Sequence, residues 1–219
     1  MTGPKLVLFD CDGTLVDSAP LIHACMEQTF REAGHAVPQF ESTKGVIGLS
    51  LDIAIARLLA CEPDESVRAM TARYKLHFAG MRGEAEHLER LYDGINELIA
   101  TLGKREDVIL GMVTGKSRRG VESVFARHGF GEHFHVVRTA DDCPSKPHPA
   151  MVLECCAATG IDPASTYVIG DAIFDMQMAR AAGATAIGVD WGYASADALA
   201  EEGAHHIVSA AAMIAGLID

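Results

Sequence analysis

The strongest constraint on the fold is a short apolar run that recurs along the chain and is followed each time by polar residues. Residues 5–10 (KLVLFD) form the first run, which ends in a carboxylate. Runs this short and continuous are typical of strands buried on both faces of a parallel sheet. We predict five such strands and a short sixth, at residues 5–10, 108–113, 134–137, 167–170, 185–189 and 207–208.

Helical segments separate the later runs. Their predicted positions are residues 117–128, 149–159 and 174–182. Because strands that alternate with helices join side by side in parallel, this order predicts a sheet covered by helices on both faces. We therefore expect an α/β fold with a Rossmann-like, three-layer parallel-sheet core.

One long stretch breaks the alternation and contains no strand-like run. Pro20 suits a first helical turn, and Gly34 suits a helix end. Further helical patterns cover residues 49–59 and 64–81. The stretch therefore predicts an all-helical domain at residues 17–88, inserted into an α/β core made of residues 1–16 and 89–219.

The net charge and the lengths of the apolar runs argue against two classes of partner, nucleic acids and membranes. Thirty acidic residues against eighteen basic ones give a formal net charge of −12, whereas nucleic-acid binders need a basic surface. The apolar runs fall far short of the roughly 20 residues that span a bilayer. Residues 1–5 leave no room for a signal peptide before the first strand. We expect no nucleic-acid or membrane partner and a cytoplasmic location.

Four polar clusters follow four of the predicted strands. They lie at residues 10–14, 114–117, 145–147 and 170–175. Ligands of open parallel sheets bind outside the carboxyl ends of the strands. Carboxylates, a hydroxyl and a lysine from distant parts of the sequence are therefore expected to meet at one edge of the sheet.

These four clusters, in this order and spacing, resemble the motifs of the haloacid dehalogenase superfamily. The resemblance covers essentially the whole chain and points to the phosphatase branch that carries a helical cap. It is closest to the phosphoglycolate phosphatases through residues 10–18 and 168–193. It implies an Mg²⁺-dependent phosphatase that acts on a small phosphorylated metabolite through an aspartyl-phosphate.

The resemblance implies roles for residues of the first two clusters. Asp10 would be the nucleophile, since a carboxylate can attack phosphorus once a cation cancels its repulsion from the phosphate. Asp12 would protonate the leaving oxygen and then deprotonate water, which partial burial near another carboxylate favours. Gly13 would let backbone N–H groups approach the phosphate, and the Thr114 hydroxyl with the Gly115 N–H would bind a phosphate oxygen.

The resemblance also implies a lysine and a metal site. Lys146 would neutralise both the nucleophile and the transferring phosphoryl group. Mg²⁺ would be held by Asp10, Asp171 and the backbone carbonyl of Asp12, which leaves positions for water and phosphate. Asp175, one helical turn beyond Asp171, would accept hydrogen bonds behind the metal ligands or bind the metal itself.

One position departs from the pattern of the superfamily. Ser or Thr usually follows the first aspartate of the last motif, and this chain has Ala172 there. A hydroxyl contact near the metal is therefore missing, and we expect weaker metal binding rather than lost activity. In the insertion, Lys44 and Arg57 could meet a second anionic group of the substrate, although basic residues of a cap more often face solvent.

Other functions share parts of this pattern of residues. A P-loop needs four residues between its first glycine and the Gly-Lys-Ser, and only three separate Gly111 from Gly115. A dehalogenase has no use for the acid at Asp12. A sugar phosphomutase similar to β-phosphoglucomutase uses the same four motifs and stays an alternative, as does a catalytically silent regulator on the same fold.

Overall fold

The computed structural model describes residues 3–84 and 87–218, and its core is one six-stranded parallel sheet. The strand order is β5-β4-β1-β6-β7-β8, with every neighbouring pair parallel. All six predicted strands are therefore confirmed. Their bounds are β1 (Lys5–Phe9), β4 (Val108–Val113), β5 (Phe134–Arg138), β6 (Thr166–Gly170), β7 (Thr185–Val189) and β8 (His206–Val208).

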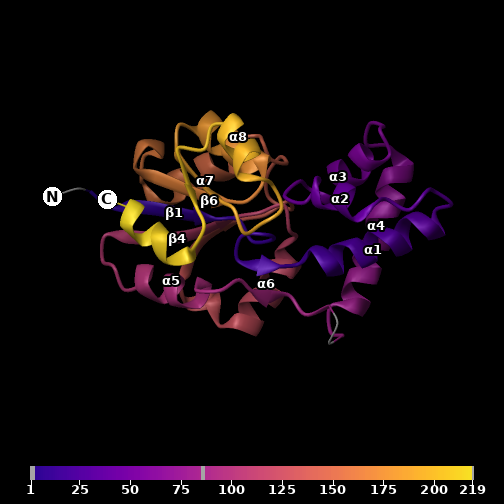
Figure 1. Ribbon diagram of the computed structural model, residues 1–219, viewed down its shortest axis with the longest axis horizontal. Coiled ribbons are helices and arrows are strands. Elements are labelled where there is room, and N and C mark those ends of the chain that lie inside the picture. The colour runs from indigo at the N-terminus through magenta and orange to yellow at the C-terminus, as the bar shows by residue number, and fades with distance from the viewer. Residues whose placement is uncertain (1–2, 85–86, 219) are drawn as a thin grey trace.

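Helices cover both faces of this sheet (Figure 1). Successive side chains of a strand point to opposite faces, so Val7 and Phe9 of β1 pack on one side while Leu6 and Leu8 pack on the other. The first face is covered by α5 (Ile95–Leu102), α6 (Arg118–His128) and the 3-10 helix η4 (Ala211–Leu217). The second is covered by α7 (Ala150–Thr159), α8 (Ile173–Ala182) and α9 (Ala196–Glu201). The predicted three-layer α/β fold is confirmed.

Among the described residues, four α-helices lie between residues 18 and 89, and they pack on one another beyond one end of the sheet (Figure 1). Pro20 stands in the first turn of the first helix, and the Asp64 side chain accepts a hydrogen bond from the Val67 N–H at the start of the fourth. These helices are α1 (Ala19–Glu32), α2 (Phe40–Lys44), α3 (Leu51–Leu58) and α4 (Glu65–Met81). None of the described helices is both long and apolar enough to cross a bilayer.

Two very short strands connect this helical segment to the sheet. β2 (Val16–Asp17) pairs antiparallel with β3 (Arg90–Leu91), so the outgoing and returning chains lie side by side. β2 straddles the predicted boundary between residues 16 and 17. The division into a core and a cap stays a prediction. The pairing of β2 with β3 shows that the two connections between the helical segment and the sheet lie next to each other.

The middle of the sheet is packed closely enough to require glycine at one position. A Cβ atom on Gly111 of β4 would lie 2.6 Å from side-chain atoms of Leu8 and Val136 and 2.9 Å from the Val136 carbonyl oxygen. We predict that Gly111→Ala lowers the free energy of unfolding by about 1–3 kcal/mol, because the backbone oxygen cannot move aside cheaply. Gly131→Ala is the control, since nothing lies within 4 Å of its Cβ position. Urea denaturation should show a lower midpoint only for the first variant, and equal midpoints would contradict the packing argument.

Candidate active site

The predicted site residues meet where β1, β4, β5 and β6 end, on the side of the sheet that faces the four inserted helices. Asp10, Asp171 and Asp175 are fully buried, and Lys146 is 1% exposed. Asp12 is 7% exposed and lines a cavity beneath the helices. The structure thus brings the chemistry-bearing residues of all four clusters to one edge.

A buried lysine lies at the centre of this group. The Lys146 ammonium is 2.9 Å from one Asp10 oxygen and 2.6 Å from one Asp175 oxygen. Removing one partner of such a buried ion pair leaves a charge that is neither solvated nor compensated, which is costly. Lys146 therefore fixes the orientation of Asp10 and Asp175 together.

The site carries more negative than positive charge. Burial raises the pKa of Asp10 to about 7, although Lys146 opposes this and Asp175 adds to it. Burial, then Asp10 and Asp175, raises the pKa of Asp171 well above its ordinary value. Burial alone would lower the pKa of Lys146, but the two carboxylates raise it instead. One ammonium does not compensate three carboxylates, so the site is short of positive charge.

The donor set fits a hard divalent cation. Asp10, Asp171 and Asp175 each offer a carboxylate oxygen, and these oxygens lie within 4.8 Å of one another. The Asp10 Oδ2 atom is buried and has no hydrogen-bond partner among the described residues. Buried carboxylates of this kind are stabilised by a metal ion. The geometry makes Asp175 a third candidate ligand, whereas the contribution of the Asp12 carbonyl stays a prediction.

Asp171 is held rigidly by its neighbours. The Thr14 hydroxyl donates a 2.8 Å hydrogen bond to one oxygen, and the Tyr193 N–H donates one of 2.9 Å to the other. Cβ atoms on Gly13 and Gly192 would lie 2.1 and 2.2 Å from Asp171 side-chain atoms, so both glycines are needed for the close approach. The predicted role of Gly13 toward phosphate stays open, but the structure shows that it makes room for Asp171.

Asp12 is engaged by two residues that the sequence analysis did not single out. Ser18 donates a 2.7 Å hydrogen bond to the Asp12 Oδ1 atom, and the Lys116 ammonium lies 2.6 Å from the same oxygen. Lys116 is also 2.7 Å from Glu89, which stands just before β3. All of these side chains are buried. In the sequence, Lys116 stands out only as the lysine of a Gly-Lys-Ser that fails the P-loop spacing, and Glu89 belongs to no motif.

The second cluster contacts the inserted helices closely. Thr114 is buried, and its hydroxyl accepts a hydrogen bond from the Lys116 N–H at 3.1 Å. A Cβ on Gly115 would lie 2.5 Å from the carbonyl oxygens of Gly48 and Leu49. Glycine at position 115 therefore allows the helical segment to approach the edge of the sheet. The predicted contact of its N–H with phosphate stays a prediction.

Ala172 faces the inserted helices as well. It is 8% exposed, and with Phe174 it belongs to the hydrophobic cluster of the four helices. A Cβ on Gly48 would lie 3.2 Å from the Ala172 methyl. A hydroxyl near Asp171 comes from Thr14 instead, and the expected weakening of metal binding stays a prediction.

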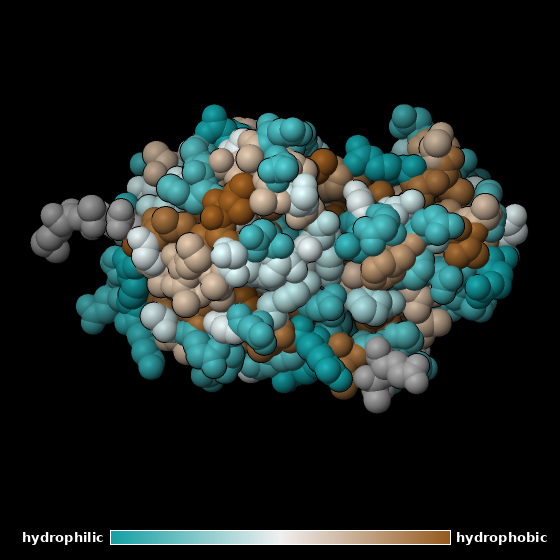
Figure 2. Space-filling model, viewed as in Figure 1, coloured by the Kyte–Doolittle hydropathy of each residue, from teal (hydrophilic) through white to brown (hydrophobic). Residues whose placement is uncertain are grey.

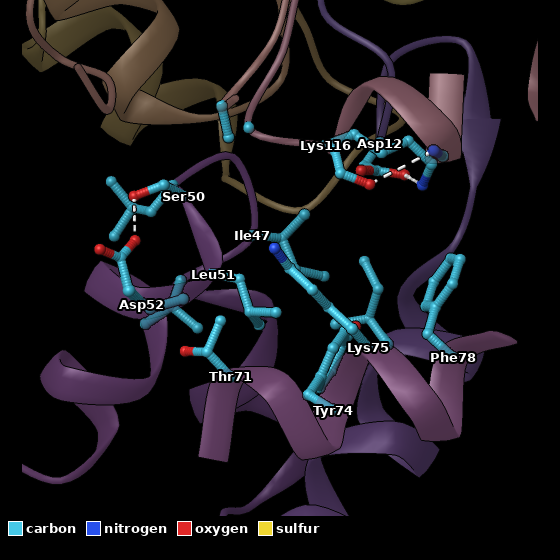
Figure 3. Close-up of a pocket in the computed structure, with 18 of the residues that line it drawn as sticks. Asp12, Ile47, Ser50, Leu51, Asp52, Thr71, Tyr74, Lys75, Phe78 and Lys116 are labelled. Atoms are coloured by element: carbon cyan, nitrogen blue, oxygen red, sulfur yellow. Dashed lines mark hydrogen bonds and ion pairs between the residues drawn. The ribbon is translucent and has the colours of Figure 1, made fainter. Parts of the chain in front are cut away.

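A cavity of about 610 Å³ opens beside Asp12, between the sheet edge and helices α1 and α4. Figure 3 shows Asp12 and Lys116 on one side of it, Asp52 and Thr71 on the other, and α4 along its floor. A substrate in this cavity would have its reacting end at Asp12.

Known proteins with similar sequences or structures exist. Residues 7–189 match the family described as haloacid dehalogenase-like hydrolase. N-acetylmuramic acid 6-phosphate phosphatase from Pseudomonas aeruginosa is 34% identical over 204 residues, covering 86% of this chain and 83% of that protein. Phosphoglycolate phosphatase from Nitrosococcus oceani is 32% identical over 197 residues, covering 87% and 85%. A haloacid dehalogenase-like hydrolase from Streptococcus pneumoniae has a TM-score of 0.83 at 23% identity, with all of both chains covered, and so shares the fold.

The carboxylate cluster predicts stabilisation by a divalent cation that depends on pH. Below about pH 7 a proton on Asp10 competes with the cation, and above it the ionised carboxylate is free to bind. Mg²⁺ should therefore raise the melting temperature more at pH 8 than at pH 6. Mg²⁺ at ten times its dissociation constant raises the free energy of unfolding by about 1.4 kcal/mol. Differential scanning fluorimetry with and without a chelator tests this. Asp171→Asn should lose the effect, and an equal shift in that variant would place the cation elsewhere.

Proposed function

The chain belongs to the haloacid dehalogenase-like hydrolase family and is a phosphatase, and we propose that it hydrolyses a small phosphorylated metabolite through an aspartyl-phosphate on Asp10. The observation that carries this proposal is the position of Asp10. One of its oxygens is paired with Lys146, and the other is buried without a hydrogen-bond partner among the described residues. A carboxylate in this setting is oriented and only partly neutralised, as a nucleophile toward phosphorus must be.

Mg²⁺ is the cation that we propose for the carboxylate cluster. Asp10, Asp171 and Asp175 would hold it, together with the Asp12 carbonyl, and it would supply positive charge near the phosphoryl oxygens. Lys146 supplies further positive charge beside Asp10. The chain's own contribution is to keep these groups fixed and dry before the substrate arrives.

The reaction proceeds in two steps. In the first, an Asp10 oxygen forms a bond to phosphorus, the bond from phosphorus to the ester oxygen breaks, and Asp12 gives that oxygen a proton. In the second, Asp12 takes a proton from a water molecule that attacks the same phosphorus. The bond from Asp10 to phosphorus then breaks, so that inorganic phosphate leaves and both carboxyl groups return to their starting forms.

The contacts of Asp12 bear on its proposed role. The carboxylate oxygen that accepts from Ser18 also faces the Lys116 ammonium. The carboxylate is thereby held in the lining of the cavity, where a leaving group in that cavity could reach it. We assign Asp12 as the acid and base, and Lys116 as a residue that positions it.

Residues 17–88 serve in this proposal as a cap over the reacting groups. The approach of Gly48 and Leu49 to Gly115 places helical-segment backbone directly against the sheet edge. Such a cover excludes water during phosphoryl transfer and contacts the part of the substrate that does not react. It also favours small substrates over macromolecules.

The substrate is proposed from the chemistry of relatives. One relative is named for phosphoglycolate and another for N-acetylmuramic acid 6-phosphate, and both compounds are phosphorylated acids. Phosphoglycolate is the first compound to test. We propose transfer to water rather than to a second sugar hydroxyl, which separates the phosphatase from a phosphomutase. Metal-dependent turnover of any ester would exclude a silent regulator. The cytoplasmic location stays a prediction.

The nucleophile is tested by Asp10→Asn. An amide attacks phosphorus poorly and carries no charge, so we predict at least about a thousandfold lower kcat for Mg²⁺-dependent phosphate release. The far-ultraviolet circular dichroism should be unchanged. Asp197→Asn, at an exposed position in the first turn of α9, is the control and should keep full activity. Retained activity in Asp10→Asn, once deamidation is excluded by mass spectrometry, would remove Asp10 from the mechanism.

The acid and base role is tested by Asp12→Asn on two kinds of ester. A poor leaving group needs protonation, and an activated aryl phosphate needs less, so the alkyl ester should lose more activity by about tenfold or greater. The variant should also accumulate phosphoenzyme, because water is no longer activated. Acid quenching and mass spectrometry would detect the phosphoenzyme. Equal losses on both esters without trapped phosphoenzyme would contradict the assignment.

A further inference from the structure

The cavity beside Asp12 is much larger than a two-carbon acid requires. Its volume is about 610 Å³. Cavities of roughly 300–1,000 Å³ hold ligands of drug size, of which a glycolyl group would fill only a small part. With phosphoglycolate bound, the rest of the cavity would contain water in contact with the lining residues. The chemistry of these residues therefore indicates which substrate the cavity binds.

Much of that lining is apolar. Met26 of α1, Ile47 and Leu51 from the segment around α3, and Tyr74 and Phe78 of α4 surround the space. The centre of the Phe78 ring lies 5.2 Å from the Lys116 ammonium, and Figure 3 shows Ile47 and Leu51 among the other lining residues, so apolar groups occur both beside Asp12 and away from it. A leaving group with an apolar body would remove this surface from water, which a short polar acid does not.

One face of α4 adds positive charge to this apolar lining. Arg68, Thr71 and Lys75 recur at helical spacing, Arg82 directly follows the helix, and all four line the cavity. Figure 3 shows the Lys75 side chain extending from α4 into the cavity. No hydrogen bond or ion pair to described residues is found for the Lys75 side chain.

A second polar group on the same face also lacks a partner. The Thr71 hydroxyl is buried and has no hydrogen-bond partner among the described residues. By contrast, the two cap cations first considered for an anionic substrate group do not line the cavity. Lys44 pairs with Glu41 at 3.3 Å, and the Arg57 guanidinium lies 5.1 Å from the centre of the Phe174 ring.

From this lining we infer that the substrate is a phosphomonoester whose leaving group has an apolar body and carries a carboxylate that binds Lys75. The phosphate lies at the Asp12 end of the cavity, the apolar body lies between Ile47 and Phe78, and the acid reaches the Lys75 ammonium. This inference rests on the proposed phosphatase function and refines it, since it places the preferred substrate above phosphoglycolate in size.

The experiment compares three esters with the Mg²⁺-loaded full chain. Phenyl phosphate and 4-(carboxymethyl)phenyl phosphate differ mainly in the carboxylate, and phosphoglycolate has the carboxylate without the apolar body. We expect kcat/KM for the carboxymethyl ester to exceed each of the other two by about tenfold or more. A highest value for phosphoglycolate, or equal values for the two aryl esters, would overturn the inference.

Two variants locate the carboxylate and the body. Lys75→Met keeps an unbranched apolar side chain and should reduce the preference for the carboxymethyl ester over phenyl phosphate to about twofold or less, mainly through KM. Lys44→Met is the control and should keep the full preference. Ala79→Phe, which adds a ring on the lining face of α4, should slow both aryl esters more than phosphoglycolate. A preference that survives Lys75→Met would overturn the assignment of Lys75.

The inference and the proposed function fail in different ways. Absence of Mg²⁺-dependent turnover of all three esters would refute the phosphatase mechanism itself. Turnover without the expected order of the esters would leave the mechanism standing and overturn only the substrate class.

Discussion

A buried ammonium between two buried carboxylates is the interaction on which this structure depends. Lys146 contacts Asp10 and Asp175, and all three side chains are buried from solvent. Removing any one of them would leave a buried charge without its partner, which is costly. The three residues come from the chain beyond β1, β5 and β6, so the ion pairs join the segments that follow these strands. The same charges that make the site reactive therefore depend on the integrity of the sheet.

The catalytic edge and the substrate cavity come from different parts of the chain. The carboxylates and Lys146 belong to loops of the sheet, whereas most of the cavity lining belongs to α1, α3 and α4 and the segments between them. The two parts contact each other at several places, including the close approach of Gly48 to Gly115 and the hydrogen bond from the Ser50 N–H to the Ser145 hydroxyl. Because the reacting carboxylates come from the sheet loops, residues of α4 that line the cavity can differ without replacing any of these carboxylates. This is consistent with relatives that are named for different phosphorylated acids.

Much of the core follows from the sequence because buried parallel strands are continuous apolar runs. The strands predicted at residues 108–113 and 185–189 have the observed bounds, and the four polar clusters follow β1, β4, β5 and β6 as expected. The pairing of β2 with β3 could not be predicted, because two residues carry no periodicity. The Lys116–Glu89 ion pair joins positions that no motif connects, and only the three-dimensional fold brings them together. The spacing of Arg68, Thr71 and Lys75 in the sequence places them on one face of a helix, but the sequence does not show that this face lines the cavity.

Tyr193 connects the start of the inserted helical segment to Asp171, one of the carboxylates of the candidate metal site. Its hydroxyl accepts hydrogen bonds of 3.0 Å from the N–H groups of Ser18 and Ala19, and its own N–H donates to Asp171. A rotation of α1 away from the sheet must either break both bonds to the hydroxyl or carry the tyrosine with it. In the second case the N–H moves away from Asp171, which loses one of its hydrogen bonds. The position of α1 and the orientation of a carboxylate in the candidate metal site are therefore linked through one side chain.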